Sequence, residues 1–243
     1  MSSVHLEGSQ AVRVAGATSV RLAALAGAVY FGLIVAFSQL TSGSPSATDP
    51  GQEVFDYVAR HHGRIQLAAV LIGFAMPAAL LWLSGLFRAL REAEGTPGFA
   101  LAALGGGVLA AASTVTGALI AGTTATRIND LGPGGARVWW TMYLLSIGAT
   151  LLGLLLLIGA TAIVCLERKL FARWFVVTSI VLALMSAVGA CAIGYDTSGI
   201  QVVAGIAVLL DSVWILLVSI FLWRHPEVAL PGGQPRRMSH DTL

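Results

Sequence analysis

Six uninterrupted apolar stretches constrain the fold of this chain more than any other feature. They cover residues 22–40, 67–87, 99–121, 138–166, 174–195 and 200–223. A helix needs about 20 residues to cross a hydrocarbon core of about 30 Å, and each stretch comes close to that length or exceeds it. The stretches are continuously apolar rather than alternating, so they predict helices and not the strands of a membrane barrel. We therefore predict an all-α, polytopic bundle of six transmembrane helices.

Composition supports a membrane location for the whole chain. Hydrophobic residues make up 56% of the sequence and charged residues only 11%, whereas soluble domains carry about 25% charged residues. The net charge of +2 gives no indication of a nucleic-acid partner, and the lipid bilayer is the expected one. We predict three parts: a cytoplasmic N-terminal tail over residues 1–21, a transmembrane domain over 22–225, and a disordered cytoplasmic tail over 226–243.

Basic residues in the loops predict the orientation, because cytoplasmic loops carry an excess of Lys and Arg. With the N-terminus inside, ten of the fourteen basic residues fall on the cytoplasmic side and four outside. This asymmetry predicts a multi-pass protein of the inner (plasma) membrane with both termini in the cytoplasm. The inner set is Arg13, Arg21, Arg88, Arg91, Arg168, Lys169, Arg173, Arg224, Arg236 and Arg237, and the outer set is Arg60, Arg64, Arg127 and Arg137.

The loop after the first stretch carries a helix start signal of its own. Asp49 precedes Pro50, and Pro is favoured at the first position of a helix, with Asp as its cap. The following residues predict a short interfacial helix that leads into the second span. Two histidines, His61 and His62, lie at the end of this helix. Neighbours on a helix point about 100° apart, so we expect no metal site. The apolar side of this helix would comprise Val54, Phe55 and Val58.

Small residues recur every four positions in the third span, a pattern typical of close helix–helix contact in membranes. Packing inside one bundle and a dimerisation seam both fit this pattern. We favour packing and leave a homo-oligomer open. The six positions are Ala102, Gly106, Ala110, Thr114, Ala118 and Gly122.

One proline within a span and the two cysteines each lead to a local prediction. Pro77 lies inside the second span and removes a backbone hydrogen bond to the carbonyl of Gly73, which predicts a kink. Cys165 and Cys191 have neither disulfide nor zinc-ligand spacing, so we expect both to be small buried side chains.

Asp211 is the one charged-type residue in the interior of a span, almost midway along residues 200–223. An Asp at the bilayer centre costs about 2.5–3.5 kcal/mol on an insertion scale. No Lys, Arg or His lies at similar depth, so we expect the neutral acid at rest. We favour a proton or cation site over a purely structural hydrogen bond. The candidate partners at this depth are Tyr30, Ser113, Thr114, Thr150 and Ser186.

Three functions remain open from the sequence. The first is a carrier or accessory transport protein in which Asp211 couples to a proton or cation, with Thr114, Thr150 and Ser186 as further ligand-binding residues. The second is an intramembrane enzyme acting on a lipophilic small molecule, with Asp211 as general acid and Tyr30 as helper. The third is a scaffold or partner subunit for another membrane protein.

Negative evidence excludes several classes of chemistry. No histidine lies within a span, no Lys is placed to hold a Schiff base, and no Walker, G-x-S-x-G or H-E-x-x-H motif occurs. We expect neither a cofactor nor a metal.

Two segments carry a resemblance to a known group. They are F-D-Y-V-A-R-H-H-G-R from Phe55 to Arg64 and W-L-S-G-L-F-R-A-L-R from Trp82 to Arg91. With six spans around them, the chain resembles the uncharacterised six-helix integral membrane proteins of high-GC Gram-positive bacteria. That group has no established activity, so the resemblance implies a fold and no function.

Overall fold

The structure, a computed structural model, contains the six predicted helices. It describes the backbone of residues 3–94, 98–168, 170–192 and 198–230, and the side chains of residues 16–94, 98–168, 170–191 and 203–230. All six helices are long and apolar enough to cross a membrane, which confirms the predicted all-α bundle of six membrane-length helices. They are α1 (Ser3–Leu40), α2 (Gly51–Glu94), α3 (Phe99–Thr126), α4 (Ile128–Arg168), α5 (Arg173–Ala192) and α6 (Ser198–Arg224), followed by a 3₁₀ turn, η1 (Pro226–Ala229).

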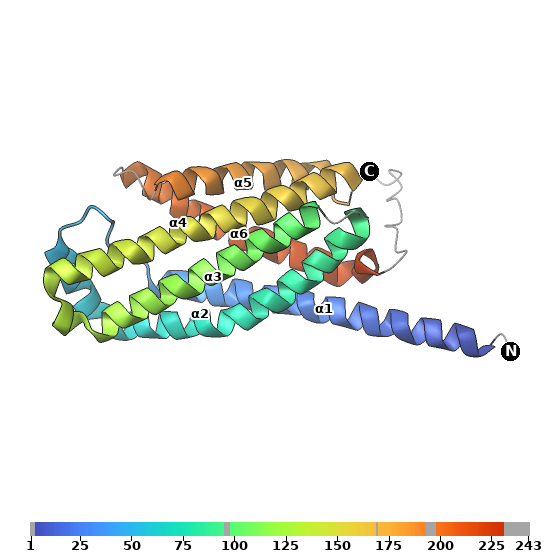
Figure 1. Cartoon of the computed structure of the whole chain (residues 1–243), viewed down its shortest axis with the longest axis horizontal. Coiled ribbons are helices and arrows are strands. Elements are labelled where there is room, and N and C mark those ends of the chain that lie inside the picture. Colours follow the sequence, from blue (N-terminus) through green and yellow to red (C-terminus); the bar gives the residue numbers. More distant parts are fainter. Residues whose placement is uncertain (1–2, 95–97, 169, 193–197, 231–243) are drawn as a thin grey trace.

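The helices form a closed ring of neighbours. Each helix packs against the next one in the chain, and α6 returns to pack against α1, while α2 also contacts α4. Figure 1 shows the helices running back and forth along the long axis of the molecule, with the N-terminal part of α1 extending beyond the bundle. Short connections between consecutive helices account for this order, because they leave only antiparallel neighbours within reach.

Helix α2 differs from the prediction at its N-terminal end. The helix predicted in the external loop begins at Gly51, near the expected start, but it runs without a break into the second span. Val54 and Val58 are buried against Trp140 and Ile128, so their apolar surface is covered by α4 and is not free for the membrane. Asp49 does not cap this helix, since its carboxylate accepts a hydrogen bond from the Ser46 N–H at 2.7 Å.

Parts of both predicted tails lie in described helical segments. Helix α1 begins at Ser3, within the stretch predicted to be a tail. Residues 226–230 are also folded, because η1 packs against α1 and α2 and buries Val228 and Ala229. The rest of the predicted C-terminal tail, residues 231–243, lies outside the described residues.

The segment between the third and fourth predicted spans is helical except around Arg127 and Gly132. Gly132 has φ 61° and ψ 179°, a conformation that only glycine adopts readily, and it separates two helical segments within α4. Pro133 starts the second segment, where its missing N–H costs nothing. Pro77 in α2 behaves differently, because the helix continues through it.

Small residues bring α3 and α4 into backbone contact. A Cβ added to Gly106 would lie 2.6 Å from the carbonyl oxygen of Gly153 and 2.6 Å from the Leu157 nitrogen. Gly153 is equally close to α3, since its Cβ would lie 2.5 Å from the Ala110 nitrogen. The small-residue pattern therefore serves packing inside the bundle, at least where it meets α4.

That pattern does not lie on a single face. A four-residue spacing drifts around a helix of 3.6 residues per turn, so successive members meet different neighbours. Ala102 is exposed, Ala110 is buried in the main core, and Ala118 packs with Ile34 and Ile72 of α1 and α2.

Of the two cysteines, Cys165 is buried as predicted, whereas Cys191 is exposed, which corrects that prediction.

The end of α2 is joined to the start of α3 by one carboxylate. Glu94 is buried and accepts hydrogen bonds from the N–H groups of Gly98, Phe99 and Ala100 at 3.1, 2.8 and 2.8 Å. These donors belong to the first turn of α3, where backbone N–H groups lack helical partners. Arg168 from the end of α4 donates to the Glu94 carbonyl at 2.6 Å, so three helix ends meet there.

Candidate functional site

Helix α6 turns Asp211 toward the inside of the bundle. Asp211 is only 1% exposed, and the residues at helical spacing around it, Ala207, Trp214 and Val218, are buried as well. The opposite face carries exposed apolar side chains, among them Leu210, Val213 and Leu217. Ala207, Trp214 and Val218 lie on the same helical face as Asp211, so the carboxyl faces protein and not lipid.

One oxygen of the Asp211 carboxyl has a partner. Ser186 Oγ of α5 lies within hydrogen-bond distance of Asp211 Oδ2, at 2.9 Å, and both side chains are buried. Oδ1 is also buried, but it has no hydrogen-bond partner among the described residues. In the same part of the chain no basic side chain forms an ion pair with Asp211. A buried polar atom without a partner costs about 1–3 kcal/mol, so this site is costly as it stands.

The single hydroxyl hydrogen of Ser186 indicates whether the Asp211 carboxyl is neutral or ionised. Ser186 Oγ lies 2.9 Å from Asp211 Oδ2 and 3.0 Å from the Leu182 carbonyl oxygen. A serine has a single hydroxyl hydrogen, which serves only one of these two acceptors. A neutral carboxyl would donate its own hydrogen to Ser186 and leave the serine hydrogen for Leu182. The geometry therefore accommodates a neutral acid better than an anion.

A second hydrogen bond crosses the same interface. The indole N–H of Trp214, one turn beyond Asp211 on α6, donates to Ser179 Oγ of α5 at 2.8 Å, and both side chains are buried. The two bonds hold α5 and α6 together in the apolar interior. Sequence reasoning missed Trp214 and Ser179. The three-residue spacing between Asp211 and Trp214 was the available signal.

Helices α1 and α2 complete the surroundings of the carboxyl. Tyr30 of α1 is half-buried and lies within electrostatic range of Asp211. Trp82 of α2 stacks edge-on against Trp214 with ring centroids 6.3 Å apart. Its indole N–H, like Asp211 Oδ1, is buried without a partner in the described part of the chain. Gly27 of α1 admits Trp82 and Ser219, since a Cβ there would collide with both.

The remaining predicted site residues form a separate pair. Thr114 of α3 and Thr150 of α4 lie with their hydroxyl oxygens 3.2 Å apart, and each also donates to a carbonyl of its own helix. Within the described residues neither threonine, nor Ser113, is hydrogen-bonded to Asp211. The structure thus brings Ser186 to the carboxyl, packs Tyr30 against the core cluster that contains Ala207 and Trp214, and places Thr114 and Thr150 at the α3–α4 interface.

No group of three or more His, Cys, Asp or Glu side chains that could hold a metal occurs in the described residues. His61 and His62 bind backbone carbonyls of their own helix through Nδ1, at 2.9 Å from Tyr57 O and 3.1 Å from Ala59 O.

Comparison with models of known protein families, with curated proteins and with solved structures found no match. The fold and the site together define a six-helix, multi-pass membrane protein with a buried carboxyl between α5 and α6.

Proposed function

We propose that this protein is a small carrier, or an accessory transport protein, in which Asp211 takes up and releases a proton or a cation. The observation that carries the proposal is the buried carboxyl with one free oxygen and no basic partner. Ionisable groups inside membrane spans are costly and typically lie on ion or proton pathways. A hydrogen bond from Ser186 alone would be met equally well by a neutral side chain, so it does not explain why a carboxyl occupies this position.

An intramembrane enzyme is the alternative function, and the position of Tyr30 supports it. Tyr30 packs against the same core cluster as Ala207 and Trp214, the neighbours of Asp211 on α6, and a carboxylic acid assisted by a phenol could protonate a lipophilic substrate, as an intramembrane enzyme requires. A scaffold role has less support, because the close contacts of Gly106 and Gly153 are used within the bundle. The membrane partner that a scaffold needs would have to bind elsewhere.

Infrared spectroscopy tests whether Asp211 exchanges its proton. We expect the wild type to show a carbonyl stretch of a protonated carboxyl near neutral pH, and Asp211→Asn to lack it. Glu94 accepts three backbone N–H groups and stays ionised under these conditions, so it does not contribute. The band is expected to shift in D₂O and to decrease as the pH rises, because a transport site must reach water.

Asp211→Asn is the matched control, because the amide keeps a donor and an acceptor at similar volume. Two results would contradict the proposal. One is the absence of an Asn-sensitive band, and the other is a band that neither exchanges in D₂O nor responds to pH. The latter would mark Asp211 as a sealed structural acid.

We further propose that both termini face the cytoplasm across the plasma membrane. An even number of spans places the two ends of the chain on one side. Arg88, Arg91, Arg168 and Arg224 lie at the same end of the bundle as the α2–α3 and α4–α5 connections. Arg60, Arg64, Arg127 and Arg137 lie at the end of the α1–α2 and α3–α4 connections, and the excess of basic residues at the first end supports this orientation.

Labelling of single cysteines in intact cells tests the orientation. On a background in which Cys165 and Cys191 are replaced, we expect a membrane-impermeant reagent to label Glu53→Cys and Arg127→Cys. Arg91→Cys and Lys169→Cys should react only after the cells are permeabilised. Labelling of Lys169→Cys in intact cells would reverse the proposed topology.

A further inference from the structure

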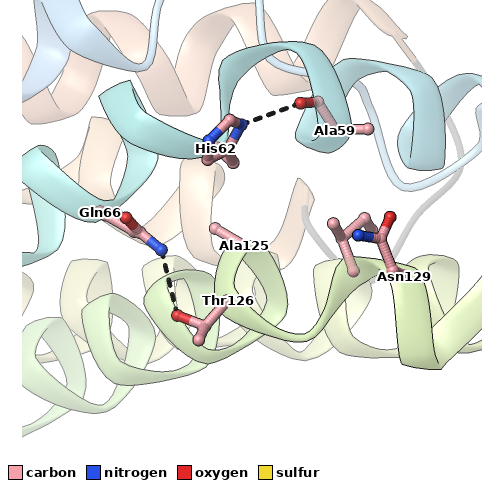
Figure 2. A pocket seen from close by; sticks show the side chains of 7 residues that line it. Ala59, His62, Gln66, Ala125, Thr126 and Asn129 are labelled. Atoms are coloured by element: carbon pink, nitrogen blue, oxygen red, sulfur yellow. Dashed lines mark hydrogen bonds between the residues drawn. The ribbon is translucent and has the colours of Figure 1, made fainter.

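A pocket of about 260 Å³ lies between α2 and the α3–α4 turn, at the end of the bundle opposite the α2–α3 connection and η1. His62 and Gln66 of α2 face Ala125 and Thr126 of α3 and Asn129 of α4 across it (Figure 2). Sites for drug-sized ligands measure roughly 300–1,000 Å³, so the space suits a smaller molecule. In the proposed topology the pocket opens on the outside of the cell.

The hydrogen bonds within the pocket leave a defined set of groups free. His62 Nδ1 lies 3.1 Å from the Ala59 carbonyl oxygen, which can only accept, so Nδ1 carries the hydrogen and Nε2 is left as an acceptor. Gln66 Nε2 donates to Thr126 Oγ1 at 3.2 Å, and Thr126 donates onward to the Gly122 carbonyl. The Gln66 carbonyl oxygen therefore remains available.

Asn129 adds an amide whose side chain makes no hydrogen bond to any described residue. The pocket thus offers three free acceptors and the free NH₂ group of Asn129. Its apolar lining consists of Ala59, Ala125 and Ile128, of which Ala125 and Ile128 are buried. A ligand that matches this surface has several hydroxyl groups on one side and C–H groups on the other.

Charged ligands fit the pocket poorly, because no charged side chain lines it. The arginines nearest in sequence have other partners: Arg60 binds the Asp56 carbonyl, Arg64 the Gln39 carbonyl, and Arg127 the carboxylate of Asp130. An anion would therefore lack a counter-charge here. A metal ion would find a single imidazole and two amides, too few strong ligands for a site.

We infer that this pocket binds a small, neutral polyhydroxyl group, either a free sugar or polyol or the sugar headgroup of a glycolipid. The Asn129 amide and the Gln66 carbonyl oxygen bind its hydroxyls, and His62 Nε2 accepts a third hydrogen bond. The apolar lining contacts its C–H face. This inference is independent of Asp211 and holds whether or not that residue exchanges protons.

One experiment with two arms distinguishes a free sugar or polyol from the headgroup of a glycolipid. Saturation-transfer NMR titrations with glucose and with myo-inositol test free ligands on the full-length protein in detergent. The thermal unfolding midpoint in nanodiscs with and without glucosyl diacylglycerol, on a phosphatidylcholine background, tests the lipid. Asn129→Leu is the main variant, because its exposed side chain has no partner to lose, and Gln66→Leu is the second.

We expect a response in at least one arm, with an affinity that falls roughly tenfold in Asn129→Leu, as expected when one or two hydrogen bonds are lost. Gln52→Leu is the matched control: Gln52 is an exposed glutamine of α2 that does not line the pocket and binds Asp56 instead. Its affinity should not change. The inference is wrong if none of the three probes gives a response, if Asn129→Leu and wild type respond alike, or if inorganic phosphate binds in their place.

Discussion

Gly106→Leu is expected to separate α3 from α4 and to lower the free energy of unfolding by about 3 kcal/mol, the upper end of the usual range for overpacking. The added Cβ alone would lie 2.6 Å from two backbone atoms of α4, Gly153 O and Leu157 N. Backbone atoms cannot rotate away as a side chain can, so the helices themselves must move apart. Thermal or denaturant unfolding in detergent measures the loss.

Gly105→Leu is the matched control, one residue away on the same helix. A Cβ at Gly105 meets no atom within 4 Å, and leucine is a better helix former than glycine. We expect this variant to be as stable as the wild type or slightly more stable. Equal stability of Gly106→Leu and Gly105→Leu would show that Gly106 does not face α4.

The fold was largely predictable because it depends on the overall pattern of apolar stretches and not on single residues. Six long apolar runs admit one kind of structure in a bilayer. The four-residue spacing in the third span predicted a close helix–helix contact, and Gly106 makes one with Gly153. The helix ends were harder to predict, since polar residues continue a helix when a neighbour covers its apolar face. Val54 and Val58 illustrate this, because α4 buries them and so extends α2 to Gly51. The junction at Glu94 depends on three N–H groups that no sequence pattern marks.

The candidate site was predictable only in its centre. A single carboxyl in a long apolar run identified Asp211, and depth along the span suggested Ser186 and Tyr30. Depth alone could not distinguish Ser186 from Thr114 and Thr150, because a residue's height in the membrane says nothing about which helix faces it. The bond from Trp214 to Ser179 was missed for a related reason. A tryptophan in an apolar span looks like packing until its N–H partner is known.

Asp211→Asn is expected to abolish proton movement while the fold remains intact. The amide can replace the carboxyl in its hydrogen bond with Ser186 but cannot gain or lose a proton. Asp211 is 1% exposed and has no basic partner in the described part of the chain, so no neighbouring residue is placed to take over its role. Ser212→Ala is the matched control, because the Ser212 hydroxyl is buried next to Asp211 in sequence but binds only the Val208 carbonyl.

The most direct test is proton flux into liposomes that contain the purified protein and a pH-sensitive dye. Potassium and valinomycin impose an inside-negative potential, and the internal pH is followed with time. We predict acidification with the wild type and with Ser212→Ala, and none above protein-free liposomes with Asp211→Asn. Equal rates for the wild type and Asp211→Asn, whether high or indistinguishable from empty liposomes, would contradict a proton-carrying role for Asp211.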